Sequence, residues 1–317
     1  MEQSELSRCF VLDGEGGATQ AEMTATGGPR WLRFDHATPN LHDILVRDHG
    51  LDTVVVDAML DDETRPRCRS VGDGALLILR GVNLNPGAHP EDMVSLRVWV
   101  DAEKLISVQL RRLFAVSSIE EAFRDKIGPK STGELSVAIA EALTERMQPT
   151  IEALDDRLDA LEDESETGAP DKLRREAADL RRTVVTLRRF IAPQRDALET
   201  FVAEQFTWQS EAQDRLLKDI VDRITRLVEQ LDEIRARSEI FQDTLAALVA
   251  EKLNRTMFVL SVVAGVFLPI SFLTGLLGIN VGGMPGVDSG AAFWVVIGLL
   301  AAITAVEIYL FRRFKIF

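Results

Sequence analysis

Two long apolar runs lie at the C-terminal end of the chain. No charged side chain occurs from Thr256 to Val287, and a second apolar run extends from Ala291 to Phe311 with Glu307 as its one charged residue. At a rise of 1.5 Å per residue, an α-helix over either run is roughly 30 Å long, which matches the hydrocarbon thickness of a bilayer. The pattern predicts two transmembrane helices, about 256–278 and 291–311, joined by a short outer loop at 279–290.

The region before these runs has helical periodicity. Apolar residues recur every three or four positions from Leu143 to Leu161, and again from Leu173 to Ile191 after a Thr-Gly-Ala-Pro break. This predicts an antiparallel helical hairpin whose second helix ends near Pro193. From Gln194 to Ala264 there is no Gly or Pro, and the apolar positions fit a heptad grid. A single helix is predicted to enter the first span, with two helices joined near Trp208 as the alternative, and the heptad seam indicates self-association.

Short runs of β-type residues mark the N-terminal part. The predicted strands are Thr53–Val56, Ala75–Arg80, Val94–Val100 and Leu105–Leu110, and the predicted helices are Leu41–His49 and Ser118–Lys126. The predicted fold class is an α+β cytoplasmic domain, similar to an α/β/α sandwich, followed by long helices and two C-terminal transmembrane helices. Its predicted divisions are 1–130 (mixed α/β domain), 131–255 (hairpin and stalk helix) and 256–317 (membrane region).

Charge refines this arrangement. The chain carries a formal charge of −14, and the final 67 residues hold more basic than acidic side chains, so the acidic excess lies before residue 251. Such a domain repels nucleic acid and attracts cations. Basic residues flank both spans whereas 281–290 has no Lys or Arg, which places both termini in the cytoplasm. The first thirty residues lack the apolar segment of a signal peptide, and Cys9 and Cys68 lack the spacing of a disulfide framework or zinc site.

The segment that ends the first span carries a motif. Phe267 to Asn280 reads Phe-Leu-Pro-Ile-Ser-Phe-Leu-Thr-Gly-Leu-Leu-Gly-Ile-Asn, and Val-Gly-Gly-Met-Pro-Gly follows. Placed after a long acidic helical domain, this segment resembles the CorA family of divalent-cation channels, which is marked by Gly-Met-Asn at this point. Here Ile279 replaces the Met, and the continuation looks more like the zinc-transporting ZntB branch.

The resemblance implies a funnel-shaped homopentamer in an inner membrane, with the first span lining a pore for Zn²⁺, moved inward as the transported ion. A Mg²⁺/Co²⁺ channel of the same family is the alternative. No nucleophile, base and metal-ligand set converges by spacing, so no enzyme or cofactor is predicted. A two-span sensor with a coiled-coil relay is a remote alternative, because the outer loop is too short to receive a signal.

The predicted selectivity motif is Gly278, Ile279 and Asn280. Five Asn280 amides around an axis would offer neutral oxygens that hold a dication through its hydration water, whereas the alternative role of Asn280 is a helix C-cap. Gly278 would allow a tight backbone and Ile279 would pack. Asp288 in the outer loop would attract ions, with a simply solvated loop residue as the alternative. The predicted pore-lining residues are Asn254, Ser261, Gly265, Leu268, Ser271 and Gly275. Small residues such as Gly265 also suit plain helix packing, and the alternative for Asn254 is an ordinary exposed polar residue.

Overall fold

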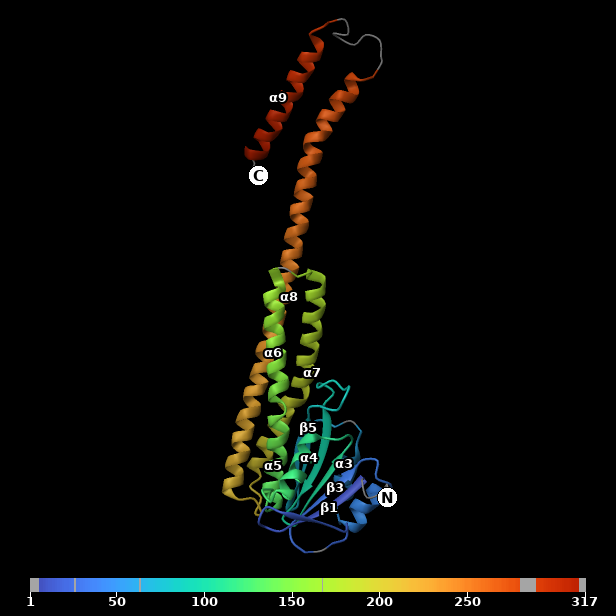
Figure 1. The fold of residues 1–317 in the computed structure, drawn as a ribbon, viewed down its shortest axis with the longest axis vertical. Coiled ribbons are helices and arrows are strands. Elements are labelled where there is room, and N and C mark those ends of the chain that lie inside the picture. Colours follow the sequence, from blue (N-terminus) through green and yellow to red (C-terminus); the bar gives the residue numbers. More distant parts are fainter. Residues whose placement is uncertain (1–5, 26, 63, 167, 280–288, 314–317) are drawn as a thin grey trace. The chain divides into compact units, whose positions relative to one another are not determined.

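The computed structural model of the chain describes residues 6–25, 27–62, 64–166, 168–279 and 289–313. By internal packing the chain divides into two units, residues 1–243 and 244–317. The first unit contains a β-sheet and most of the helical region, and the second contains the membrane region (Figure 1). The three-part division at residues 130 and 255 stays a prediction.

One sheet forms the base of the first unit. Within the described residues it has seven strands in the order β2-β1-β3-β7-β6-β5-β4, and only the β3–β7 pair is parallel. The strands are β1 (Ser7–Leu12), β2 (Ala18–Ala21), β3 (Arg30–Asp35), β4 (Arg67–Val71), β5 (Gly74–Gly81), β6 (Val94–Val100) and β7 (Lys104–Gln109). The strand predicted at Ala75–Arg80 and the hairpin of Val94–Val100 with Leu105–Leu110 are therefore confirmed.

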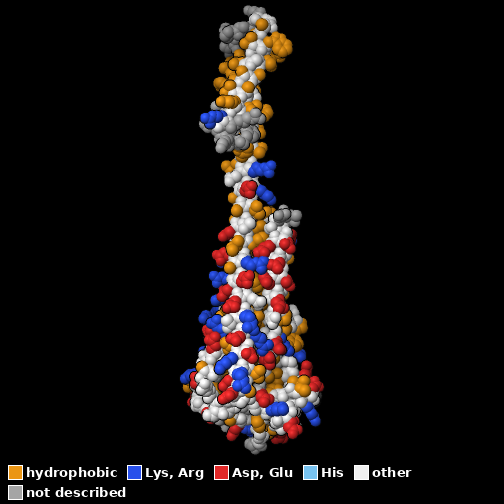
Figure 2. Space-filling model, turned by 90° about the vertical axis from the view of Figure 1, so that its left-hand side faces the viewer, with side chains coloured by type: hydrophobic (Ala, Val, Ile, Leu, Met, Phe, Trp, Pro, Cys, Tyr) orange, Lys and Arg blue, Asp and Glu red, His pale blue; other side chains and the backbone are white. Residues whose placement is uncertain are grey.

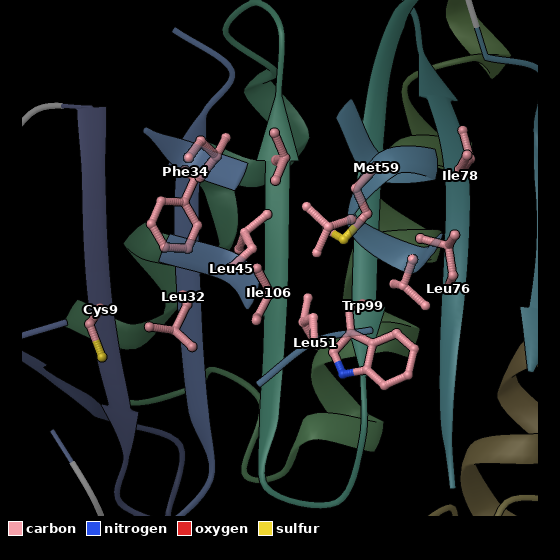
Figure 3. Close-up of a cluster of buried hydrophobic side chains, with 14 residues drawn as sticks. Cys9, Leu32, Phe34, Leu45, Leu51, Met59, Leu76, Ile78, Trp99 and Ile106 are labelled. Carbon is pink, nitrogen blue, oxygen red and sulfur yellow. The ribbon is translucent and has the colours of Figure 1, made fainter. Parts of the chain in front are cut away.

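A short helical layer covers one face of this sheet. It consists of α2 (Leu41–Asp43), the π-helical turn η1 (Ile44–Asp48) and α3 (Thr53–Leu60). Leu45 and Met59 from this layer pack against Phe34 and Ile78 of the sheet (Figure 3). The helix predicted at Leu41–His49 is thus confirmed.

The strand predicted at Thr53–Val56 is wrong, because these residues form the first turns of α3. Their β-branched side chains favour a strand, but the Asp52 carboxylate accepts a hydrogen bond from the Val54 amide at 2.7 Å and caps a helix there. Val55, Val56 and Met59 then lie on the buried side of that helix. Capping and burial against the sheet outweigh the weak local preference.

Longer helices cover the other face. Alternation along β3 places Trp31 opposite to Leu32 and Phe34, and Trp31 packs against Phe123 of α4 (Phe114–Arg124) with 6.0 Å between ring centroids. Helix α5 (Thr132–Glu145) contacts β5, β6 and β7. Helices on both faces make an α/β/α sandwich, and the fold class predicted from sequence is confirmed.

Phe123→Ala is expected to lower the free energy of unfolding by about 3–5 kcal/mol, because it removes a buried ring from contacts with Trp31 and Phe10. Denaturant unfolding of the purified protein, followed by tryptophan fluorescence, measures the change. Ile127→Ala is the matched control three residues beyond α4, because Ile127 is 77 % exposed and its truncation should leave the midpoint almost unchanged. Equal midpoints for both variants would contradict this packing role.

The long helices differ from the predicted hairpin and stalk in two places. Helix α6 is Gln148–Asp163, α7 is Pro170–Ala203 and α8 is Glu211–Leu277. The predicted end near Pro193 is wrong, because α7 continues for ten more residues beyond that proline. The continuous helix from Gln194 is also wrong, and the alternative join near Trp208 is confirmed.

Local interactions explain both differences. Gln194 is fully buried and its Oε1 accepts a hydrogen bond from the Arg80 amide, so tertiary contacts hold α7 together beyond the proline. At the break, Trp208 stacks on Phe206 and donates a hydrogen bond to the Asp73 carbonyl. Ser210 and Gln213 then exchange side-chain and backbone hydrogen bonds as a capping box that begins α8.

The heptad seam of α8 is buried inside a single chain as far as Leu245, whereas Leu248 is exposed. Leu217, Ile224 and Leu231 are shielded from solvent in the first unit. Ion pairs join the same part of α8 to α5, α6 and α7, as in Arg223–Glu141, Arg237–Asp155 and Arg188–Asp232. Because neighbouring helices of the same chain fill this seam, it carries no argument for self-association, contrary to the sequence-based interpretation.

Candidate pore segment and outer motif

The membrane region consists of the C-terminal part of α8 and helix α9 (Ala292–Arg313). Both helices contain stretches long and apolar enough to cross a bilayer. Hydrophobic side chains predominate over this unit in Figure 2, whereas acidic and basic side chains crowd the surface of the first unit. The structure thus contains the two C-terminal candidate spans that the hydropathy pattern predicts.

One side of the α8 membrane segment is partly covered within the chain. These half-buried positions are Phe258, Val262, Gly265, Val266, Pro269, Ile270 and Leu273. At about 100° per residue they follow one stripe along the helix. The large apolar residues of this stripe are Phe258, Val262, Val266, Ile270 and Leu273.

Most predicted pore-lining residues lie on an adjacent side and are exposed in the single chain. They are Asn254, Ser261, Leu268, Ser271 and Gly275. A Cβ added to Gly275 would meet no atom within 4 Å. This side is therefore free to contact something outside the chain, and its role as pore lining stays a prediction.

Gly265 lies at the border of the two sides. It is half-buried, and a Cβ at this position would lie 3.1 Å from Cζ of Phe311 in α9. The small size of Gly265 therefore has a packing reason that the sequence left open. Four residues later, Pro269 has no backbone N–H to donate to the Gly265 carbonyl, which leaves that oxygen without its usual helical donor.

The Gly-Ile-Asn motif begins directly after α8. The Gly278 amide donates to the Thr274 carbonyl at 2.9 Å, and a Cβ on Gly278 would lie 3.0 Å from that same oxygen. This close approach agrees with the predicted need for glycine. Ile279 is largely exposed. Asn280 and Asp288 lie outside the described residues, so their roles stay predictions.

Comparison with known proteins identifies the family. The model of the family described as "CorA-like Mg2+ transporter protein" matches residues 26–313. The chain belongs to this family. The resemblance drawn from the motif is confirmed, and the chain is a divalent cation transporter rather than an enzyme.

Several known proteins align with this member of the CorA family over almost its whole length. The divalent cation transporter CmaX of Pseudomonas aeruginosa is 38 % identical over 317 residues, covering 96 % of this chain and 95 % of CmaX. The zinc transport protein ZntB of Yersinia pseudotuberculosis is 32 % identical over 319 residues, covering 99 % and 97 %. The structure of full-length CmaX matches with a TM-score of 0.86 and covers 97 % of each chain. The CorA magnesium transporter of Methanocaldococcus jannaschii, 18 % identical with a TM-score of 0.83 over 97 % of this chain and 98 % of that one, has the same fold.

The polar side chains of the α8 membrane segment offer only neutral oxygens. From Thr256 to Ile279 the polar side chains are hydroxyls, and those of Thr256 and Thr274 donate to backbone carbonyls of α8. Over the parts of the chain that the structure describes, no three His, Cys, Asp or Glu residues gather as a metal site. Cys9 and Cys68 are both free, as their spacing indicated. Residues 256–279 therefore offer a dication neither thiolate nor carboxylate.

Proposed function

We propose that this chain forms a homopentameric pore that carries Zn²⁺ into the cell across an inner membrane. The observation that carries the proposal is the exposed side of α8, where Ser261, Ser271 and Gly275 offer small or neutral side chains to a neighbour or to water. The Gly-Ile-Asn motif and its similarity to the ZntB branch support Zn²⁺ as the ion. The Mg²⁺ alternative is supported by the family description and by the general name of CmaX.

Discrimination between ions in such a pore rests on size and hydration. Neutral oxygens bind a hydrated dication weakly enough to release it, whereas thiolates or several carboxylates would retain Zn²⁺. In this proposal the Asn280 amides contact the hydration shell of the ion, and Asp288 raises the cation concentration outside. We therefore propose weak binding and modest selectivity among divalent cations.

The test is ion flux into liposomes that contain the purified protein. Zn²⁺ and Mg²⁺ are supplied separately, with and without a pH gradient, and uptake is followed by an enclosed fluorescent indicator. Zn²⁺ flux well above that of protein-free liposomes supports the proposal. Flux of Mg²⁺ but not Zn²⁺ would replace it by the magnesium alternative, and flux of neither ion would reject the pore.

Native mass spectrometry of the protein in detergent is expected to show a pentamer. The exposed membrane side of α8 needs a partner, and five such helices enclose a pore. The heptad seam gives no support here, because it is filled within one chain. A predominantly monomeric or dimeric particle would contradict the pentameric pore.

The outer loop is expected to be accessible from outside the cell and the first unit to be enclosed. In a variant carrying Ser289→Cys, an impermeant maleimide should label intact cells, whereas Ala102→Cys, in the exposed β6–β7 turn, should react only after permeabilisation. Cys68 is an unsuitable reporter, because burial, with a smaller effect of Glu204, raises the pKa of its thiol to about 12. The reverse labelling pattern would overturn the topology.

A further inference from the structure

A cavity of about 550 Å³ is lined entirely by residues of the first unit. Strands β5 and β6, the loops near them and the middle of α7 supply the residues that line it. Four arginines line it: Arg80, Arg97, Arg111 and Arg189. In a protein whose overall charge is strongly negative, this local concentration of guanidinium groups requires an explanation.

Arg97 is the most unusual of the four. Its side chain is 0 % exposed, yet it lines the cavity from β6. Nη2 donates to the Asp61 carbonyl at 2.8 Å, whereas Nε and Nη1 have no hydrogen-bond partner among the residues that the structure describes. Burial, followed by the nearby charge of Arg80, lowers the pKa of Arg97 to about 10. Asp62 and Asp61 act on Arg97 as nearby negative charges. Burial of a guanidinium whose N–H groups lack acceptors is still costly, because nothing replaces the hydration that those groups lose.

Arg80 enters the same cavity from β5. Its guanidinium lies over the Phe190 ring, 4.5 Å from the centroid, and donates to the carbonyls of Met93 and Thr64. Nε again has no partner in the described part of the chain. Burial and the charge of Arg189 lower the pKa of Arg80. Neutral carbonyl oxygens thus accept hydrogen bonds from two nitrogens of Arg80, and within the described residues no carboxylate forms an ion pair with it.

Carboxylates also line the cavity without pairing with these two arginines. Asp62 and Asp92 are exposed, and Glu91 accepts a hydrogen bond from Thr183. Within the described residues, none of these three acids forms an ion pair with Arg80 or Arg97, and Asp62, like Asp61 nearby, acts on Arg97 as a neighbouring charge. The acids lie toward solvent, and the unpaired donors lie deeper.

We propose that this cavity binds the phosphoryl group of a small phosphorylated ligand, with Arg97 and Arg80 holding its oxygens. A guanidinium offers paired N–H donors whose spacing matches two oxygens of a phosphoryl group, and a dianion balances two arginines. The volume lies in the range of small-molecule sites and exceeds the needs of free phosphate, so part of the ligand lies beside Phe190 and Arg189. The site is separate from the proposed pore and does not depend on the transported ion.

Thermal unfolding of the full-length protein in detergent tests this site. Inorganic phosphate and adenosine monophosphate, each without divalent metal, are compared with sodium chloride at equal ionic strength. A ligand at a hundredfold excess over its Kd should raise Tm by about 5 °C. A larger response to the nucleotide assigns the cavity to an organic phosphate, and an equal response assigns it to phosphate itself. Equal shifts with phosphate, nucleotide and chloride would overturn the proposal.

Arg97→Met should abolish the phosphate-dependent shift without lowering Tm in chloride, because it removes an unbalanced buried charge. The matched control is Arg69→Met, an exposed arginine of β4 outside the cavity, which should respond like the wild type. Arg189→Met serves as a second variant, because its exposed side chain is not needed for folding, and it should weaken phosphate binding about tenfold. If Arg97→Met and Arg189→Met both retain the full shift, the arginines are structural and the proposal is wrong.

Discussion

Asn280→Ala is expected to abolish divalent cation flux in liposomes while leaving the oligomer intact. In the proposed pore, Asn280 supplies the only side-chain oxygen of the Gly-Ile-Asn motif, and alanine leaves the ion's hydration water without that acceptor. Asn280→Asp should instead retain binding and slow release, because clustered carboxylates attract a dication strongly. The motif residue lies outside the described part of the chain, so its expected effect depends on the motif and on family membership.

Flux measurements with Zn²⁺ and Mg²⁺ separate this role from helix capping. Ser289→Ala, a polar truncation in the same segment between the two candidate spans, should keep normal flux. Native mass spectrometry and thermal unfolding check that each variant assembles and folds. Near-normal flux of both ions in a folded Asn280→Ala protein would show that Asn280 only ends the helix.

Gly275→Leu is expected to reduce flux about tenfold or more without destabilising the chain. Gly275 is exposed in the single chain, and a Cβ there meets no atom within 4 Å. A leucine is therefore accommodated within one subunit, and its helix propensity exceeds that of glycine by about 0.8 kcal/mol. Five leucines projecting toward one axis would obstruct a narrow pore and repel hydrated ions.

Gly298→Leu provides a closely matched control. Gly298 lies in the other candidate membrane helix, α9, and a Cβ there also meets nothing within 4 Å. The two variants make the same chemical change in comparable surroundings, but only Gly275 lies on the proposed pore side. If Gly275→Leu and Gly298→Leu both keep the flux of the unsubstituted protein, Gly275 faces lipid and another side of α8 lines the pore.

The two proposed sites use opposite chemistry. The pore segment has neutral oxygens and no anionic ligand, which suits rapid passage of a hydrated cation. The cavity in the first unit has desolvated arginines with unpaired donors, which suits retention of an anion. Phosphate binding and cation flux are therefore separately measurable, and loss of one by substitution should leave the other unchanged.

The accuracy of sequence-based prediction differed along the chain for physical reasons. The β6–β7 hairpin and the membrane spans follow from continuous local patterns, and both were predicted. The start of α8 had a readable signal, because Ser210 and Gln213 have the spacing of a capping box, but the absence of Gly and Pro suggested a continuous helix instead. Thr53–Val56 was mispredicted because the local preference of β-branched residues is weaker than one cap and a buried face.

The sequence by itself determined the membrane spans, the mixed α/β domain, the long helices and the motif that identifies the family. These depend on hydrophobic periodicity and on residues adjacent in the chain. Only the tertiary structure decided that most of the heptad seam of α8 is filled by its own chain and that Gly265 packs beside Phe311. It also decided that Arg97 is buried with two nitrogens that lack hydrogen-bond partners among the described residues. Periodicity indicates which side of a helix is apolar but not which partner covers it. The positions of arginines in the sequence likewise do not show which of them are buried. Those outcomes depend on contacts between segments far apart in the sequence.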